Sequence, residues 1–509
     1  MGKYLLAIDA GTGAGRCLIV NEEGEKISSV YREWGYTTPK GLEPYGKEFD
    51  SNYFWKTVCD LIKEAITKGG ISKEEIRGVS STSQRQGALF LDKNGRELYA
   101  GPNIDTRGLW VQDIIEESLG DSLYEIAGHA PYLIFMPARL LWFRENKPEI
   151  YKKIAHALAI NDWILFKLSG VYATEPSTAS ESLLFDIHRV EWSDRIIDAL
   201  EFSEDILPKL GKAGDPTGEV TQESSIETGL KKGTSVIIGG PDIECGLLGC
   251  KVLKEGEVGA TLGTTAPIQI VTSKPVIDSK KRTWSSCHII PSEWVVESNA
   301  QMAGSVYRWF RDKIINEREN RAGKENKISY KEMDEMVLKE GVGSDNTFAL
   351  LGPEIMNVKE IQIIRQGLLV FPPPANPITT PINLGKLTRA ILENIGYAIK
   401  GNCDQLAEIS KKDITELKAC GGLTKSGVFT RILADILDVP IAVPKIREGT
   451  SFGCAICAAV GSGLHNNLVE ASREMVTLEK VIPVRSNVDA YKNYYRRWLS
   501  LYEESPNLI

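Results

Sequence analysis

Two short turns rich in glycine and threonine lie almost half of the 509-residue chain apart, and strand-like runs flank both of them. The first turn, residues 9–15 (DAGTGAG), follows the apolar run 4–8 and precedes a second strand-like run at 16–20. The second turn, Gly263-Thr264-Thr265, lies between two further runs of this kind. A pattern of strand, turn and strand that returns after half a chain predicts two related domains.

The order of strands and helices around each turn is typical of an α/β domain. A helix is expected from residue 51, because Asp50 and Ser51 offer a cap and apolar residues follow at helical spacing. Alternating strands and long helices predict domains built on mixed sheets, which we place at residues 1–247 and 248–509. The predicted strands include 4–8, 16–20, 26–31, 76–80, 88–91, 235–238, 257–262, 268–271, 417–420 and 441–443, and the predicted helices include 387–409, 427–437 and 451–460.

Composition and charge exclude several classes of protein. Basic side chains number 60 and acidic ones 68, a net charge of −8 that lacks the positive excess needed to bind nucleic acid. The most apolar stretch, 133–143, is interrupted by Pro137 and Arg139 and is shorter than the ~20 apolar residues that span a bilayer. Nine scattered cysteines favour reduced thiols. Because the N-terminus also lacks a signal-peptide pattern, we expect a cytoplasmic protein with no nucleic-acid or membrane partner.

The first turn carries the side chains of a phosphate site. It is not the dinucleotide fingerprint, because a strand rather than a helix follows it, and the chain contains no GxxxxGKS/T motif. Backbone N–H groups around Gly13 and the hydroxyl of Thr12 can face phosphate oxygens, Arg16 supplies positive charge, and Asp9 can hold a hydrated Mg²⁺. The alternative is an ordinary tight turn. A second such turn half a chain away favours a pair that holds a polyphosphate.

Two further segments are candidate parts of the same site. Asp242 follows a strand at an expected helix start, where the helix dipole favours the ionised carboxylate that a general base needs. An ordinary N-cap aspartate is the alternative. Gly421-Gly422 ends a strand before a helix, a geometry in which the backbone can approach a nucleotide.

An acceptor pocket is predicted from two polar segments. Phosphoryl transfer needs a positioned hydroxyl, a base, Mg²⁺ and donors around the transferred phosphate. Gln84 and Arg85 lie between two strand-like runs, and Asp105 lies in the segment NIDTR; side chains of these types pair with hydroxyls. Solvated loops are the alternative. The five histidines show no metal spacing, and the pair Cys454 and Cys457 is interpreted as buried and structural, with redox or metal chemistry as the alternative.

These segments together resemble the FGGY family of carbohydrate kinases, in the family's order and over nearly the whole chain. DAGTGAGR is similar to the family's first phosphate loop, SQRQG and NIDTR to its sugar-side segments, GGPD to its catalytic-base segment and GATLGTT to its second phosphate loop. FMPARLLWFREN and GGLTKSGVFTRILADILDVPI resemble the two family signatures, with Arg139 where lysine is usual. The resemblance implies two actin-like (ribonuclease H-like) domains around a central cleft, each a mixed five-stranded sheet with flanking helices. It also implies a homodimer or homotetramer.

The resemblance also implies roles for individual residues. Residues 1–247 would bind the sugar and residues 248–509 the nucleotide of an ATP- and Mg²⁺-dependent kinase. Asp242 would deprotonate the acceptor hydroxyl and, together with Asp9, support Mg²⁺ through water. The implied phosphate contacts are Thr12, Gly13, Arg16, Gly263 and Thr264, the implied adenosine contacts are Gly421, Gly422 and Ser426, and the implied acceptor contacts are Gln84, Arg85, Asp105 and Asp242.

The acceptor predicted in this way is a small ketose or polyol phosphorylated at a primary hydroxyl. Gln84-Arg85 resembles glycerol kinases, but Gln86 and Ile243 depart from the residues usual there. The segment 84–88 shares the Gln-x-x-Gly-Ala character of xylulose kinases, and NIDTR with Asp242-Ile243 resembles the autoinducer-2 kinase type. A pentulose-like or autoinducer-2 precursor-like acceptor is therefore predicted. The alternatives are a glycerol or polyol kinase, an actin-like ATPase or scaffold without an acceptor, and a kinase-derived sugar sensor.

Overall fold

The computed structural model describes residues 3–317, 327–359, 366–373 and 381–505, and the chain divides into two compact units. The first unit comprises Met1–Glu255, Val271–Val295 and Glu448–Thr477. The second comprises Gly256–Ile270, Val296–Arg447 and Leu478–Ile509. The expected division at 247/248 falls close to the first of these boundaries, but the later segment Glu448–Thr477 lies with the first unit.

The sheet of the first unit has the order β12-β13-β4-β1-β2-β3 in the described part of the chain. β1, β2 and β3 form the predicted antiparallel meander, and β4 and β13 continue the sheet parallel to β1. These five strands make the expected mixed sheet, to which β12 adds an antiparallel edge. The bounds are β1 Tyr4–Ala10, β2 Ala14–Asn21, β3 Lys26–Glu33, β4 Ile76–Ser83, β12 Pro216–Glu219 and β13 Ser235–Ile237.

Helix α1 (Ser51–Gly69) begins where the sequence predicts it. Asp50 Oδ1 accepts hydrogen bonds from the backbone N–H groups of Asn52 and Tyr53, and the helix ends at Gly70 in the left-handed conformation. The predicted apolar positions, such as Phe54 and Leu61, are buried in the core of this unit. The helix thereby covers β2 and β3.

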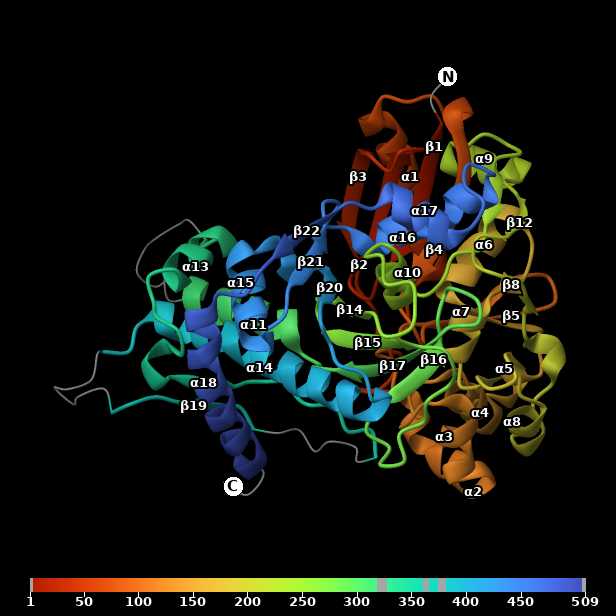
Figure 1. Ribbon diagram of the computed structural model, residues 1–509. Helices are drawn as coiled ribbons and strands as arrows, with labels where there is room; N and C mark the ends of the chain where they lie inside the picture. Colours follow the sequence, from red (N-terminus) through yellow and green to blue (C-terminus); the bar gives the residue numbers. More distant parts are fainter. Residues whose placement is uncertain (1–2, 318–326, 360–365, 374–380, 506–509) are drawn as a thin grey trace. The chain divides into compact units, whose positions relative to one another are not determined.

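Close backbone packing explains why α16 (Gly449–Gly461) belongs to the first unit. In Figure 1 this blue helix lies against the red strands of the N-terminal sheet, and its contacts are with β1, β4 and α10 (Asp242–Leu248). A Cβ atom added at Gly453 would lie 1.8 Å from the carbonyl oxygen of Cys245, and one at Gly249 would lie 2.1 Å from that of Gly449. Only glycine at these positions lets α10 and α16 approach so closely.

The remaining elements of the first unit flank this sheet and carry a smaller sheet of order β6-β5-β7. Their strands are β5 Ala88–Leu91, β6 Glu97–Gly101, β7 His156–Ala159, β8 Ala173–Thr174, β9 Phe185–Asp186, β10 Glu191–Trp192, β11 Lys209–Leu210 and β16 Trp284–Cys287. Their helices are α2 Gln112–Leu119, α3 Asp121–Ala127, α4 Met136–Asn146, α5 Pro148–Tyr151, α6 Ile160–Ser169, α7 Pro176–Ser180, α8 Asp194–Ala199, α9 Gln222–Thr228 and α17 Leu468–Met475.

Six of the described strands of the second sheet repeat the same topology, in the order β17-β15-β14-β20-β21-β22, and β16 is a seventh strand beside β17. β14 pairs antiparallel with β15 and parallel with β20, β21 continues parallel to β20, and β22 is an antiparallel edge. The prediction of two related domains is thus confirmed at the level of strand order. The bounds are β14 Val258–Thr261, β15 Pro267–Thr272, β17 Trp294–Asn299, β20 Leu417–Cys420, β21 Ile441–Pro444 and β22 Leu478–Val481.

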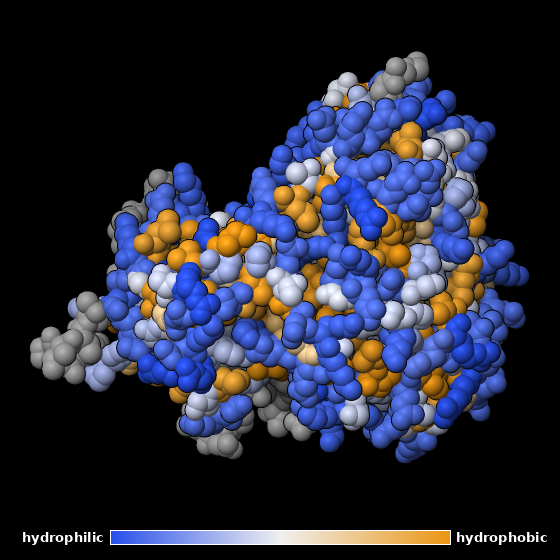
Figure 2. All heavy atoms as spheres, in the orientation of Figure 1, coloured by the Kyte–Doolittle hydropathy of each residue, from blue (hydrophilic) through white to orange (hydrophobic). Residues whose placement is uncertain are grey.

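The helices of the second unit include the two that the sequence predicts here, α14 (Leu384–Ser410) and α15 (Gly427–Leu437). The other helices are α11 Ala303–Trp309, which continues into a π-helical turn, α13 Tyr330–Val337 and α18 Arg485–Glu504. β18 (Phe348–Leu350) and β19 (Leu368–Val370) pair antiparallel as a separate two-stranded sheet. None of the helices among the described residues combines the length and apolar character needed to cross a bilayer. On the face drawn in Figure 2, hydrophilic residues predominate and apolar ones occur in small groups.

Candidate active site

Three parallel strands of the first unit end side by side, and the predicted catalytic residues lie at these ends. Asp9 is next to last in β1, Gln84 and Arg85 follow β4, and Asp242 follows β13 after a short turn. Gln84 N–H donates to the Ala10 carbonyl at 2.9 Å, which fixes the ends of β1 and β4 together. Ligands of α/β sheets bind outside the carboxyl ends of such strands. The fold therefore brings together the residues that the sequence places far apart.

Asp242 is the first residue of α10, and Pro241 is the residue that precedes the helix. Asp242 Oδ1 accepts a hydrogen bond from the backbone N–H of the next residue, Ile243, at 2.9 Å. Burial raises the pKa of Asp242 to about 7, the positive charge of Arg85 opposes this rise, and the negative charge of Asp9 adds to it. A carboxylate with a pKa near neutrality is suited to accept a proton in the transition state.

The first turn holds Asp9 and Arg16 opposite one another, because these residues pair across β1 and β2. Ser451 Oγ on α16 donates to Asp9 Oδ2 at 2.7 Å, and burial raises the pKa of Asp9. Arg16 Nη1 lies 3.8 Å from Glu448 Oε1, while its buried Nε has no hydrogen-bond partner among the described residues. An anion bound at this turn would give that donor a partner.

Hydrogen bonds link the turn to the polar segments that the sequence assigns to the acceptor. The side chain of Asn103 pairs with the Thr12 hydroxyl at 3.1 Å, and its backbone N–H donates to Gln84 Oε1 at 3.0 Å. Gln84 Nε2 in turn donates to the Tyr36 hydroxyl at 3.1 Å and lies 3.4 Å from the Gly11 carbonyl. Gln84 thus holds the first turn and the segment 103–107 in one arrangement.

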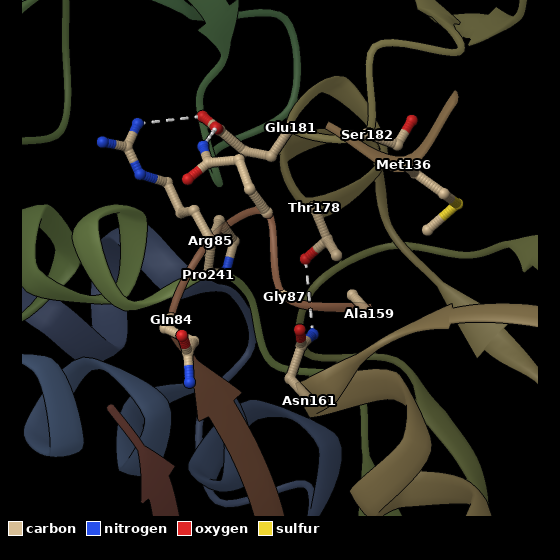
Figure 3. Close-up of a pocket in the computed structure, with 11 residues that line it drawn as sticks. Gln84, Arg85, Gly87, Met136, Ala159, Asn161, Thr178, Glu181, Ser182 and Pro241 are labelled. Carbon is tan, nitrogen blue, oxygen red and sulfur yellow. Dashed lines mark hydrogen bonds and ion pairs between the residues drawn. The ribbon is translucent and has the colours of Figure 1, made fainter. Parts of the chain in front are cut away.

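A pocket of about 330 Å³, which includes space open to solvent, is lined by Pro241, the residue before Asp242, and by several polar side chains. Figure 3 shows Arg85 bent back toward Glu181 at one end of this pocket, and Asn161 with Thr178 at the other. Of the described residues that line it, only Arg85 and Glu181 are charged, and their Nη1 and Oε1 atoms are 3.1 Å apart. The lining residues are Gln84, Arg85, Gln86, Gly87, Met136, Ala159, Asn161, Thr178, Glu181, Ser182 and Pro241.

Asp105 lies outside this lining and is fully buried. Arg107 Nε donates to Asp105 Oδ2 at 2.7 Å, the Tyr99 hydroxyl donates to the same atom, and Lys47 N–H donates to Oδ1 at 3.2 Å. Both carboxylate oxygens are therefore engaged within the protein. The structure assigns Asp105 to the support of the segment 103–107, and its predicted contact with an acceptor stays a prediction.

In the second unit, the turn between β14 and β15 forms the predicted hairpin and exposes Thr264. Gly304 N–H, at the start of α11, donates to the Gly263 carbonyl at 3.1 Å, and Ser305 N–H donates to that of Thr264 at 3.2 Å. A Cβ atom at Gly304 would lie 2.3 Å from the Gly263 oxygen. The Ser305 hydroxyl donates to the Thr264 carbonyl as well, at 3.2 Å, so the start of α11 holds the turn through its backbone and one side chain.

The glycine pair after β20 lies directly beside this hairpin. Leu423 N–H donates to the Leu262 carbonyl at 3.0 Å, and Gly421 has φ +101°, with an added Cβ 2.5 Å from that same oxygen. Gly422 faces open space. Ser426 caps α15 and donates to Asp334 Oδ1 at 2.9 Å, so its hydroxyl is engaged within the unit. Gly263, Thr264, Gly421 and Gly422 therefore gather at one edge of the second sheet, whereas Ser426 has a structural task here.

Comparison with known proteins decides the family. Residues 4–249 match the N-terminal domain of the FGGY family of carbohydrate kinases, and residues 258–462 match the C-terminal domain of that family. The chain belongs to the FGGY family. It is therefore an ATP-dependent carbohydrate kinase, an enzyme that phosphorylates a sugar, and its two units have the predicted actin-like fold. This finding sets aside the alternative of an actin-like ATPase without an acceptor.

Individual relatives agree with this assignment. An autoinducer-2 kinase of Enterobacter sp. (strain 638) is 30% identical over 515 aligned residues, which cover 100% of this chain and 95% of the relative. A gluconate kinase and a ligand-bound xylulose kinase, both from Lactobacillus acidophilus, superpose on the whole chain with TM-scores of 0.84 at 18% identity, also over 100% of each solved chain. At that identity the likeness concerns the fold.

Two residues of this FGGY kinase site were missed by the sequence analysis. Glu181 lies in a run of small residues, where a single acid carries no pattern. Arg139, which the sequence marks only as a departure from the family signature, is fully buried on α4. It donates to the carbonyls of Gln86 and Pro102, the latter at 2.9 Å, and so ties the two acceptor-side segments together.

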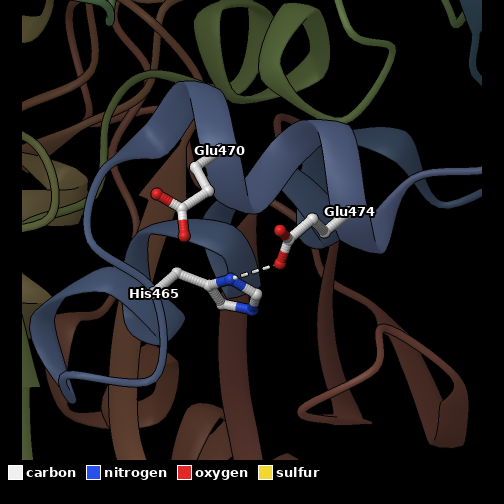
Figure 4. A group of neighbouring side chains, drawn as sticks. All are labelled: His465, Glu470 and Glu474. Atoms are coloured by element: carbon white, nitrogen blue, oxygen red, sulfur yellow. Dashed lines mark ion pairs between the residues drawn. The ribbon is translucent and has the colours of Figure 1, made fainter.

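Two other groups of the first unit are satisfied without a ligand. His465 Nδ1 lies 3.3 Å from Glu474, and Glu470 accepts from the side chain of Asn466, so the metal-type cluster in Figure 4 is held by its own hydrogen bonds and ion pair. The sequence analysis missed this cluster because it considered histidine spacing alone. Cys454 and Cys457 are free and fully buried, as predicted, and pack against Cys245 of α10.

Proposed function

We propose that this kinase transfers the γ-phosphoryl group of ATP to a primary hydroxyl of a small ketose or polyol, with Asp242 as the general base. One observation carries the proposal: Pro241, which directly precedes Asp242, lines the polar pocket of about 330 Å³. Most of the side chains that line this pocket are polar, which suits an acceptor that carries several hydroxyl groups. Asn161, Thr178 and Gln86 offer both donors and acceptors to its hydroxyls.

The residues of the first unit supply the chemistry of transfer. Asp242 takes the proton of the acceptor hydroxyl as that oxygen forms its bond to the γ-phosphorus. The bond between the γ-phosphorus and the bridging oxygen breaks, and its electron pair leaves with ADP. Arg16, whose Nε is buried without a partner among the described residues, donates to the phosphate oxygens, as do the N–H groups around Thr12 and Gly13.

Asp9 and Asp242 fit the magnesium ion that the family resemblance implies. Both offer the carboxylate oxygens that this cation prefers. The charge of Asp9 contributes to the raised pKa of Asp242, so a cation beside them would relieve a repulsion that the structure contains. When bound, Mg²⁺ neutralises charge on the phosphates. In the second unit, we assign Gly263 and Thr264 to the phosphates of ATP and Gly421 and Gly422 to its adenosine, while Ser426 supports this side as the N-cap of α15.

The acceptor class follows from the relatives and from the pocket. The relative that covers the whole chain at 30% identity is named an autoinducer-2 kinase, and one solved neighbour is a xylulose kinase. Both names point to small polyhydroxy compounds. We therefore propose a pentulose-like or autoinducer-2 precursor-like acceptor, and keep glycerol and other short polyols as the second candidate because Gln84 and Arg85 are compatible with them.

The test is ADP release by the purified protein with Mg-ATP and one acceptor at a time. The panel contains D-xylulose, D-ribulose, L-fuculose, glycerol, erythritol, D-gluconate and the autoinducer-2 precursor, with ATP alone as the blank. We expect one ketose or polyol to exceed the blank strongly and to yield a phosphate ester at a primary carbon, identified by ³¹P NMR. ADP release at the blank rate with every member would contradict the proposed function.

A further inference from the structure

Glu181 lies at the centre of a buried hydrogen-bond network on the charged side of the acceptor pocket. It follows α7 directly and its side chain is 3% exposed. Oε1 accepts from Arg85 Nη1 at 3.1 Å and from the Ser286 hydroxyl at 3.0 Å, while Oε2 accepts from Gln86 Nε2. His129 Nε2 lies 3.6 Å from Oε2, behind the pocket wall.

The backbone is arranged so that two consecutive side chains meet this one carboxylate. In an extended chain, successive residues point to opposite faces. Gln86 instead has φ +56°, in the left-handed region, and this turn brings its side chain to the same carboxylate as that of Arg85. Such a conformation is unfavourable for a residue with a side chain and persists where the surroundings hold it. The hydrogen bond to Glu181 is one contact that holds it, and Arg139 on the Gln86 carbonyl is another.

The pairing of Arg85 with Glu181 also determines the net charge of the pocket lining. Arg85 and Glu181 are the charged residues among the described lining, one of each sign and in direct contact, so the lining as a whole carries no net charge. Two further carboxylates, Asp9 and Asp242, lie at the strand ends beside it. An acceptor with a carboxylate of its own would meet Glu181 and these acids, and the guanidinium it needs is already paired.

We propose that Glu181 is the positioning and specificity-determining residue of the acceptor site: it aims Arg85 and Gln86 and makes the pocket select neutral polyhydroxy compounds over aldonates. This inference rests on the proposed function and deepens it. Glu181 does not touch the reacting atoms. It acts through Arg85 and Gln86, both of which line the pocket.

The experiment compares two small polyhydroxy compounds, the neutral D-xylulose and the negatively charged D-gluconate. The variant Glu181→Gln keeps the shape of the side chain and removes its charge. We expect KM for the neutral acceptor to rise about tenfold with KM for ATP unchanged, and the ratio of kcat/KM for gluconate to that for xylulose to rise about tenfold or more. The double variant Arg85→Gln with Glu181→Gln, which removes both members of the ion pair, should bring the ratio back toward its wild-type value.

A matched control comes from the second unit. Glu393 forms a buried pair with Arg389, at 2.8 Å, that has no part in the pocket, so Glu393→Gln should lower thermal stability and leave the acceptor ratio unchanged. If Glu181→Gln lowers activity on both acceptors equally, Glu181 is structural only and the inference is overturned. A wild-type preference for gluconate would overturn this inference together with the proposed ketose or polyol acceptor, while the assignment to the kinase family stands. A wild-type protein that phosphorylates no acceptor would instead overturn the proposed function, and this inference with it.

Discussion

The two units share one strand order but differ in what they place at the carboxyl ends of their parallel strands. At this edge the first unit carries side chains with charge, namely Asp9, Arg85 and Asp242. The second unit carries glycine and threonine, with Gly263, Thr264 and Gly421 held by backbone contacts. Both sheets have the same strand order. The residues in the turns determine whether the carboxyl edge of the sheet carries charged side chains or glycine and threonine.

This contrast supports the proposed division of the reaction between the two units. Charged side chains with a shifted pKa, such as that of Asp242, are typical of the place where protons move. Glycines at close backbone approaches, such as Gly421, are typical of the place where a nucleotide lies against the main chain. Changes in the first unit should therefore affect catalysis and the acceptor, and changes in the second should affect ATP.

The largest effect is expected for Asp242→Asn, because an amide cannot accept the acceptor's proton. We expect kcat to fall about 10³-fold, within the range of general-base contributions, while the affinity for ATP is retained. Single-turnover ADP formation measures the first quantity, and calorimetric titration with ADP the second. Turnover within a few-fold of wild type would contradict the assignment of the base.

Gly421→Ala should instead weaken the binding of ATP and leave the acceptor site little changed. A Cβ atom at this position would lie 2.5 Å from the Leu262 carbonyl oxygen, and φ is +101°, so the turn must move. We expect a loss of about 1–3 kcal/mol in the free energy of unfolding and a rise in KM for ATP of about 10²-fold, with KM for the acceptor little changed. Gly427→Ala is the control, because Gly427 begins α15 and nothing lies within 4 Å of an added Cβ. Equal effects of the two variants would contradict the special role of Gly421.

The pH dependence of the reaction tests the electrostatics of the first unit alone. Burial raises the pKa of Asp242 to about 7, and the base acts only when deprotonated. The value of kcat/KM for the acceptor should therefore rise with pH, about tenfold per unit below pH 7, and level off above it. Ser451→Ala removes a donor to Asp9 and should raise the pKa of Asp9 further. Because the negative charge of Asp9 raises the pKa of Asp242, a less ionised Asp9 should shift the profile slightly toward lower pH. A flat profile between pH 5 and 8 would show that no group of this pKa limits the reaction.

The sequence predicted the sheets and the turns because both depend on local patterns. The meander, the helix after Asp50, and the glycine turns at Gly263 and Gly421 all follow from propensities and spacing that a short window reveals. Contacts between distant segments leave no such trace. Nothing local indicates that Glu181 reaches Arg85, or that residues after Glu448 return to the first unit through the glycines of α16.

Arg139 shows this limit most directly and carries the smallest expected effect. Its planar guanidinium donates to the carbonyls of Gln86 and Pro102, and lysine has no fork that reaches both. Arg139→Lys should therefore raise KM for the acceptor about five- to tenfold and leave KM for ATP unchanged, because it loosens the acceptor-side segments of the first unit alone. Arg144→Lys on the same helix is the control, since its side chain is partly exposed and its partners are the Leu200 carbonyl and surface carboxylates, away from the acceptor-side segments. An equal rise in the KM values for the acceptor and for ATP in Arg139→Lys would show that the two binding sites are coupled. It would contradict the proposed division of roles between the units.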